Sequence, residues 1–109
     1  NEIYTVSLEL DSESLFPSEY NLIQNYPNPF NPSTVISFSI PAENHVMISV
    51  YDISGKLVNT LIDHNMGPGY HSVSWNGKDS NGLSVSSGLY VYTLSSNDTS
   101  LSGKMMLMK

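Results

Sequence analysis

The segment richest in candidate metal-ligating oxygens is residues 76–82, Asn-Gly-Lys-Asp-Ser-Asn-Gly. Asn76, Asp79 and Asn81 could supply side-chain oxygens, which are the ligands that Ca²⁺ prefers. Their spacing differs from that of the twelve-residue calcium loop, and no Glu follows where a bidentate ligand would stand. Asn-Gly pairs are also strong signals for tight turns. The segment is therefore predicted to be a turn, with a weak calcium site at these three residues as the alternative and no cofactor expected.

Other residue types that could carry chemistry are scattered along the chain. His45, His64 and His71 lie on three different segments without the spacing of a zinc site. We expect His71 at the core edge, hydrogen-bonded to the backbone. No GxSxG elbow accompanies the many serines, and the acidic residues stand mostly singly in expected turns or in the linker rather than as a facing pair. These patterns predict a protein that is not an enzyme.

Aromatic side chains offer one further binding possibility. Five tyrosines in or near expected strands could form a platform for stacking sugars: Tyr26, Tyr51, Tyr70, Tyr90 and Tyr92. Tyrosines in strands more often fill a core edge or pair across strands. Carbohydrate binding therefore stays an alternative, and it requires an exposed row of rings on one face of a sheet.

Composition excludes several classes of function. The chain of 109 residues has a net charge of −6, no Arg, and lysine only at positions 56, 78, 104 and 109. Nucleic-acid binding needs several phosphate contacts from basic side chains, so we do not expect it. Cys is absent, which removes disulfides and thiolate sites. No run of eighteen apolar residues occurs, so no helix that spans a membrane is expected.

Apolar and polar residues alternate in short stretches separated by turn signals. The alternation covers residues 34–40, 45–51, 70–75, 88–94 and 101–108, and weakens over 56–62, where a bulge near Asn59 is possible. This pattern predicts an all-β, immunoglobulin-like antiparallel β-sandwich of about seven strands. Trp75 is expected near the centre of its core, and Gly55 is expected to supply a positive φ in the turn 52–55.

The N-terminal part has a different composition. Residues 3–10 alternate loosely, and a polar stretch follows. We expect residues 1–19 to be the tail of a preceding domain or an extra strand plus a linker, and residues 20–109 to form the sandwich. The exposed polar linker suits proteolysis, which we place between Leu10 and Tyr20. Three prolines within residues 27–32 exclude helix and central strand, so this proline segment should be a rigid extended turn that packs Tyr26 or Phe30 onto the sandwich.

Five sequence motifs in order resemble a known family. They are Tyr-Pro-Asn-Pro-Phe-Asn-Pro-Ser-Thr at 26–34, Val-Tyr-Asp-Ile-Ser-Gly-Lys-Leu-Val at 50–58, Trp-Asn-Gly at 75–77, Ser-Gly-Leu-Tyr at 87–90 and the strand 104–109. Together they are similar to the type A C-terminal sorting domain of proteins exported by the type IX secretion system. The same pattern resembles the immunoglobulin-like domain of the flagellar hook-capping protein. Asn76 and Lys56 stand where family members usually have Asp and often have Arg.

The resemblance implies a sorting signal at the C-terminus of a larger cargo, which is recognised by the outer-membrane export machinery and in many members removed by a sortase-like enzyme. It implies a secreted or cell-surface location, and Lys109 as the last residue suits such a signal. A structural scaffold is the leading alternative. The residues expected to be read by partners are Pro27, Asn28, Pro29, Phe30, Asp52, Gly55, Lys56, Gly88, Tyr90, Lys104, Met106 and Lys109.

Overall fold

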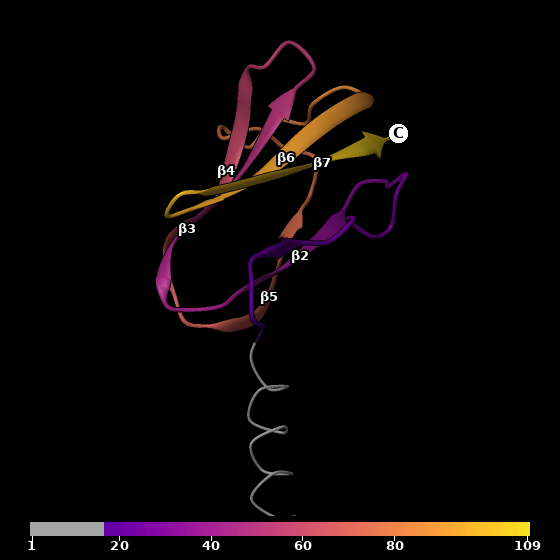
Figure 1. The fold of residues 1–109 in the computed structure, drawn as a ribbon. Coiled ribbons are helices and arrows are strands. Elements are labelled where there is room, and N and C mark those ends of the chain that lie inside the picture. The colour runs from indigo at the N-terminus through magenta and orange to yellow at the C-terminus, as the bar shows by residue number, and fades with distance from the viewer. Residues whose placement is uncertain (1–16) are drawn as a thin grey trace, which may run out of the picture.

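The computed structural model describes residues 17–109; the predicted strand at 3–10 and most of the predicted cleavage region lie outside the described residues. The described chain forms seven strands and no helix (Figure 1): β1 (Asn21–Leu22), β2 (Thr34–Ile40), β3 (Asn44–Asp52), β4 (Leu57–Met66), β5 (Gly69–Trp75), β6 (Gly88–Ser96) and β7 (Thr99–Leu107). The predicted all-β sandwich of about seven antiparallel strands is confirmed.

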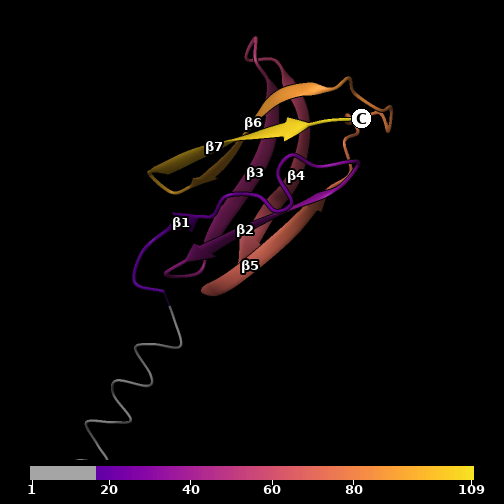
Figure 2. The ribbon, with the colours of Figure 1, turned by 90° about the vertical axis from the view of Figure 1, so that its right-hand side faces the viewer.

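The strands form two antiparallel sheets that make up the two layers of the sandwich (Figure 2). One sheet has the order β1-β2-β5, and the other has the order β4-β3-β6-β7. Strands β2 and β5 are adjacent although β3 and β4 separate them in sequence, and β3 pairs with β6 across a similar gap. The chain passes from one sheet to the other between β2 and β3, between β4 and β5, and between β5 and β6, so neither sheet is built from one stretch of the chain.

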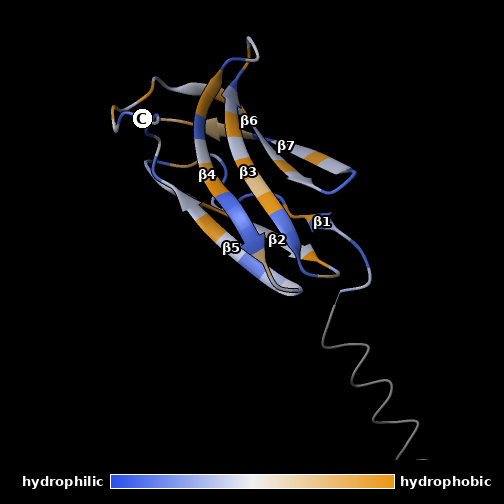
Figure 3. Cartoon of the chain, turned by 90° about the vertical axis from the view of Figure 1, so that its left-hand side faces the viewer, coloured by the Kyte–Doolittle hydropathy of each residue, from blue (hydrophilic) through white to orange (hydrophobic). Residues whose placement is uncertain are grey.

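The core lies between the inward faces of the two sheets. Successive side chains of a strand point to opposite faces, which explains the alternation of more and less hydrophobic residues along β3 in Figure 3. Trp75 is 1% exposed, as predicted, and it packs against Phe30 and Tyr90 at ring-centroid distances of 5.7 and 5.3 Å. The other fully buried apolar side chains are Ile36, Phe38, Ile40, Val46, Ile48, Val50, Tyr92, Leu94, Met105 and Leu107.

Strand β4 differs most from its predicted extent. It continues to Met66, four residues beyond the predicted end, because β3 pairs with it as far as Asn44. The register shifts at two places, and Asn59 lies between them, which confirms the predicted irregularity there. Each shift inserts one extra residue, and this explains why the alternation along β4 is weak. The predicted positive φ of Gly55 is also confirmed, at 89°.

One cross-strand pair in β6 and β7 is unusually close. Gly103 lies opposite Tyr92, and a Cβ atom at position 103 would lie 2.5 Å from the Tyr92 ring. Real Cβ atoms do not approach other atoms so closely, so the absence of a side chain at Gly103 gives the ring its space. Glycine therefore weakens the strand locally but allows a large aromatic side chain to cross it.

Replacing Gly103 by Ala should destabilise the domain. Either the Tyr92 ring or the β7 backbone must move, and overpacking of this kind typically costs about 1–3 kcal/mol. Urea denaturation followed by tryptophan fluorescence would measure the change. Gly67→Ala is the matched control, because a Cβ at Gly67 has no atom within 4 Å and its φ is not left-handed. Equal stability of the two variants would contradict the close packing of Tyr92.

Candidate recognition surface

The five motifs meet at one end of the sandwich. Strands β3, β5 and β7 end there, and β2, β4 and β6 begin there, because neighbouring strands run antiparallel. We call this the motif end (upper and right-hand side of Figure 1), and it consists of residues 26–33, 52–56, 76–87 and 107–109. The opposite end holds residues 17–20, where Tyr20 accepts hydrogen bonds from Asn44 and Ser96.

The proline segment lies along the outer edge of β7. The Phe30 amide donates to the Met106 carbonyl at 2.9 Å, and the Met108 amide donates to the Phe30 carbonyl at 3.0 Å. The Asn28 side chain accepts a third bond, from the Met106 amide at 2.9 Å. Edge strands expose unpaired backbone groups to other chains, and here the proline segment covers the last part of that edge. Phe30 thus extends the four-stranded sheet by one parallel contact.

The Phe30 side chain enters the core at the same place. It is 2% exposed and contacts Trp75, so the prediction that Tyr26 or Phe30 packs on the sandwich is confirmed for Phe30. Tyr26 is 80% exposed, although its backbone pairs with Val35 of β2. The two aromatic side chains of the segment thus have different surroundings, one on the surface and one in the core. The segment joins both sheets, since Tyr26 bridges to β2 and Phe30 to β7.

A buried polar network supports the proline segment from below. The Asn25 side-chain amide donates to Thr34 Oγ1 at 2.9 Å and to the Pro27 carbonyl at 3.2 Å, and the Thr34 hydroxyl donates to the same carbonyl. The Tyr92 hydroxyl accepts a hydrogen bond from the backbone amide of Asn25 at 3.0 Å and donates one to the Ile23 carbonyl at 3.1 Å. Burial raises the pKa of Tyr92 above its usual value. The hydroxyl therefore stays protonated at neutral pH and keeps its donor role.

The 76–82 segment is a turn, as predicted. Asp79 Oδ1 accepts hydrogen bonds from the amides of Asn81 and Leu83 at 2.9 and 3.0 Å, an arrangement typical of an Asx turn. Within residues 17–109 no group of three His, Cys, Asp or Glu side chains comes together, and the weak calcium site at Asn76, Asp79 and Asn81 stays a prediction. Gly77 has a φ of 72°, and a Cβ there would lie 3.2 Å from the Pro32 carbonyl.

The 52–56 turn is organised by one carboxylate. Asp52 Oδ1 accepts hydrogen bonds from the Ser54 hydroxyl at 2.6 Å, the Ser54 amide at 2.9 Å and the Lys56 amide at 3.0 Å. The Ser54 hydroxyl and then the Lys56 amide lower the pKa of Asp52 below its usual value of 3.8. Both donors favour the charged carboxylate. These three hydrogen bonds hold the turn together, and they are stronger when Asp52 is ionised.

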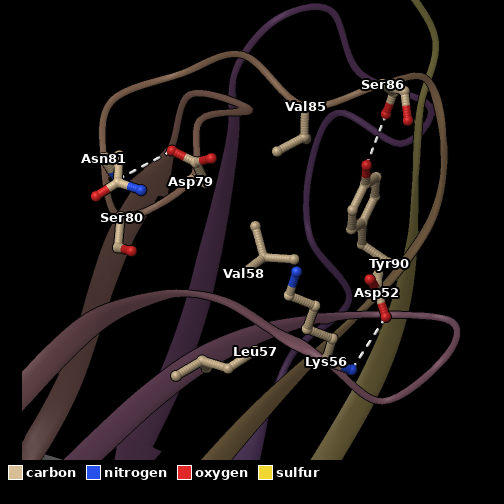
Figure 4. Close-up of a pocket in the computed structure, with 10 residues that line it drawn as sticks. All are labelled: Asp52, Lys56, Leu57, Val58, Asp79, Ser80, Asn81, Val85, Ser86 and Tyr90. Carbon is tan, nitrogen blue, oxygen red and sulfur yellow. Dashed lines mark hydrogen bonds between the residues drawn. The ribbon is translucent and has the colours of Figure 1, made fainter.

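A pocket of about 340 Å³ lies between this turn and residues 79–86 of the loop that joins β5 to β6. Figure 4 shows its walls: the turn below, the 79–81 segment to one side, and Tyr90 to the other. The Lys56 side chain extends from the turn into the space between them. The Tyr90 hydroxyl donates a hydrogen bond to the Ser86 carbonyl at 2.7 Å, which holds the Tyr90 side of the pocket in place. The pocket joins residues from two predicted groups, the partner-recognition residues and the calcium alternative.

The predicted recognition residues differ in accessibility. Phe30 and Tyr90 are buried and support the surface from inside, whereas Pro27, Lys56 and Lys109 are exposed. Lys104 is exposed but lies on the outer face of the four-stranded sheet, in one cross-strand row with Val91, Tyr51 and Leu57. The other predicted residues, Asn28, Pro29, Asp52, Gly55, Gly88 and Met106, are exposed or partly exposed at or beside the motif end.

Sequence reasoning missed three residues on which this surface depends. Asn25, Tyr92 and Gly103 form the support beneath the proline segment, yet they are separated by up to 78 residues in sequence. An Asn directly before a Pro-rich motif and a Gly inside a strand were the available signals. Neither signal shows which distant residue is contacted, because it is the pairing of β6 with β7 that brings Tyr92 and Gly103 together.

The structure also bears on the predicted backbone contact of His71 and on the tyrosines considered as a sugar platform. His71 Nε2 lies 2.8 Å from the Gly67 carbonyl, which confirms the predicted backbone contact. Tyr90 and Tyr92 are buried, and Tyr51 is partly buried. Tyr26 pairs with Val35, and Tyr70 of β5 pairs with Ser39, so the two exposed tyrosines lie on opposite sides of β2 at backbone positions roughly 13 Å apart along it. The exposed row of five rings that a sugar platform requires is not formed.

The two layers, the strand order and the absence of helix within residues 17–109 define an immunoglobulin-like domain. The family model of the FlgD Ig-like domain matches residues 30–100, which is more than half of the chain. The chain therefore belongs to the FlgD Ig-like domain family. No curated protein matches the chain. The part of the chain that the structure describes contains no helix long and apolar enough to cross a membrane.

Solved structures with the same fold include two proteins of Porphyromonas gingivalis and FlgD. The dimeric latent PorU of Porphyromonas gingivalis is 20% identical over 81% of this chain, with a TM-score of 0.65. PorZ, a surface component of the type IX secretion system of the same organism, is 20% identical over 82%, with a TM-score of 0.57. FlgD of P. aeruginosa is 25% identical over 68%, with a TM-score of 0.55. The chain corresponds to 9% of PorU, 12% of PorZ and 58% of that FlgD.

Replacing Tyr92 by Phe should loosen the proline segment. The Asn25 backbone amide and the Ile23 carbonyl would each lose a partner, and leaving a buried group such as this amide unpaired costs about 1–3 kcal/mol. Hydrogen exchange should show faster exchange at the Phe30 and Met108 amides than in the wild type. Tyr70→Phe is the control, since this side chain is 67% exposed. Unchanged exchange at both amides would show that the hydroxyl does not hold the segment.

Replacing Asp52 by Asn should change how stability depends on pH. The pKa of Asp52 is lowered in the folded state, so its contribution is present above the unfolded value of about 4 and is lost as pH falls through the folded pKa. The stability difference between wild type and variant should therefore be largest near neutral pH and shrink toward pH 2. Thermal melts across this range would measure it, and a difference that grows on acidification would contradict the assignment.

Proposed function

We propose that the domain is a non-catalytic sorting signal, which directs a larger protein through the type IX secretion machinery to the cell surface or the medium. The observation that carries the proposal is the convergence of five separated motifs on one end of the sandwich. The cargo would precede residue 17 at the opposite end, so it would leave the motif end free for recognition. A sortase-like enzyme would then act between Leu10 and Tyr20.

The solved structures with a similar fold are compatible with the proposed sorting role. PorZ is described as an essential surface component of a type IX secretion system, and its match here lies at 20% identity. At such identity the likeness establishes the fold, and the link to secretion comes from the motifs. The recognised surface would be the motif end, where exposed side chains rest on a rigid polar network.

A structural scaffold is the second candidate, and the family match favours it. The chain belongs to the FlgD Ig-like family, and the Xanthomonas campestris FlgD, linked by its description to hook capping in flagellar assembly, is 23% identical over 89% of this chain, with a TM-score of 0.55. A scaffold domain would hold neighbouring subunits and would not respond to a secretion machinery. The two candidates therefore differ in what an export assay would show.

The test is the export of a fluorescent reporter fused upstream of residues 1–109. In a bacterium with the type IX machinery, we expect the fusion outside the cell and the reporter alone in the periplasm. In a strain without the machinery, the fusion should stay in the periplasm. A folded, protease-resistant fusion that stays in the periplasm of both strains would contradict the sorting role and favour the scaffold.

Deleting residues 104–109 is unsuitable as the only test. Met105 and Leu107 are 1% and 0% exposed, and Phe30 pairs with this part of β7. The deletion would therefore unfold the core while it removes the surface. Substitutions of exposed side chains at the motif end separate recognition from folding.

A further inference from the structure

We propose that residues 5–10 of this chain form an additional strand, which pairs antiparallel with the outer edge of β5 and extends the three-stranded sheet. The sequence left two possibilities for these residues, the tail of a preceding domain or an extra strand, and they lie outside the described residues. A surface of the described domain would thus be occupied by the same chain, whether or not the domain is a sorting signal.

The outer edge of β5 presents backbone groups that could bind a further strand. On β2, Val35 uses its amide and carbonyl to bond Tyr26, on the side away from β5. Its cross-strand partner therefore directs its own amide and carbonyl away from β2, and so does every second residue of β5. These residues are Tyr70, Ser72 and Ser74, and we call their amides the edge amides. In the described part of the chain, none of them has a backbone partner.

The edge of β5 also lacks the features that protect the other edge strands. The edge of β4 has two register shifts and the charged Asp63, and the Val58 carbonyl accepts a hydrogen bond from the Ser80 amide. The outer edge of β7 is covered near its end by the proline segment. Strand β5 has no charged residue, proline or register shift over its seven residues. Because such features keep edge strands from pairing, their absence indicates that this edge is covered in the protein.

Incompletely buried apolar side chains border the space beside β5. Strands β4 and β5 are the edge strands on this side of the sandwich, which faces the viewer in Figure 3. Ile62 is the one buried residue among the ten of β4. Several partly buried apolar residues that pack against the core lie in these two strands: Val58, Leu61, Met66 and Val73. A further strand beside β5 would cover part of this apolar surface, which is favourable.

The segment before the described residues has the pattern that such a strand requires. Apolar or aromatic residues alternate with polar ones over seven positions: Tyr4, Val6, Leu8 and Leu10 against Thr5, Ser7 and Glu9. In a strand, alternate side chains share a face. The apolar set would face β4 and the core, and the polar set would continue the outer face of the sheet, where Ser72 and Ser74 are exposed.

The direction and length of the chain fit this placement. Strand β5 begins at the end of the sandwich that holds residues 17–20, so a segment that leads toward this end is antiparallel to β5. Residues 11–20 connect Leu10 to β1, and ten residues span up to about 33 Å. The three strand spacings between the added strand and β1 require only about 14 Å.

The loop after β5 sets the limit of the pairing. Its residues 78–80 close the gap between β4 and β5 at the motif end, since Lys78 accepts from the Trp75 side chain and Ser80 donates to β4. The added strand would therefore begin with Thr5 beside Ser74. It would end with Leu10 beside Gly69, which puts Ser7 directly opposite Ser72.

Amide hydrogen exchange of the full chain tests the pairing. We expect the edge amides to be protected, whereas an open edge would let them exchange rapidly. Val6→Asn/Leu8→Asn should speed their exchange by at least about tenfold, because it turns polar side chains toward the core. Thr5→Asn/Ser7→Asn is the matched control, since it places the same residue type on the outer face and should keep the protection. Rapid exchange in the wild type, or equal exchange in both variants, would overturn the inference.

A disulfide tests which residues lie opposite each other, because the chain has no Cys of its own. Hydrogen-bonded antiparallel pairs have Cα atoms about 5.5 Å apart, a separation that a disulfide spans. Ser7→Cys/Ser72→Cys should therefore give a cross-linked monomer on oxidation. Ser7→Cys/Ser37→Cys is the control, because Ser37 lies one strand further across the sheet. No cross-link in the first variant, or equal cross-linking in both, would overturn the pairing.

The competing occupant of this edge is a second copy of the chain. We expect a monomer in analytical ultracentrifugation, with edge amides that stay protected on dilution. A dimer whose edge amides lose their protection on dilution would overturn the assignment to residues 5–10 and place the second copy at the edge of β5.

Discussion

The position of Phe30 is the constraint on which the rest of this domain depends. Its backbone pairs with β7, and its side chain packs against Trp75 between the two sheets. If Phe30 left this place, the outer edge of β7 would open and the core would lose its cover at the motif end. The adjacent turns would also lose their support, because the Gly77 backbone approaches the Pro32 carbonyl closely. One residue therefore couples the edge of a sheet, the core and the surface.

The support beneath the proline segment suits this loop to the recognition role that we propose for it. Flexible loops lose conformational entropy when they become ordered on binding, whereas a segment that is already held in place avoids this loss of entropy. Here the Tyr92 hydroxyl, the Asn25 amide and Thr34 hold the segment before any partner arrives. The same groups are buried, so they contribute to folding as well as to the shape of the surface. Changes to them would therefore affect both the stability of the fold and the shape of the surface.

Both functions considered for this domain use the same architecture. An immunoglobulin-like sandwich presents loops at two ends, and here the motifs occupy one end while residues 17–20 lie at the other. A scaffold and a sorting signal each need such an end to face a partner. The fold shared with FlgD, PorU and PorZ therefore fits either function.

Much of this domain was determined by local sequence. The period-two alternation along 34–40 and 45–51 identified the strands and their inward residues, because the pleat of a strand fixes which side chains share a face. Turns containing Gly55 and Asn76-Gly77 were also predictable, since their backbone conformations favour particular residues. The site was only partly predictable: the motif residues were found, but not their convergence at one end or the pocket beside Lys56. Contacts such as Tyr92 with Gly103 and Asn25 join residues distant in sequence, and only the pairing and packing of strands decide which distant residues meet.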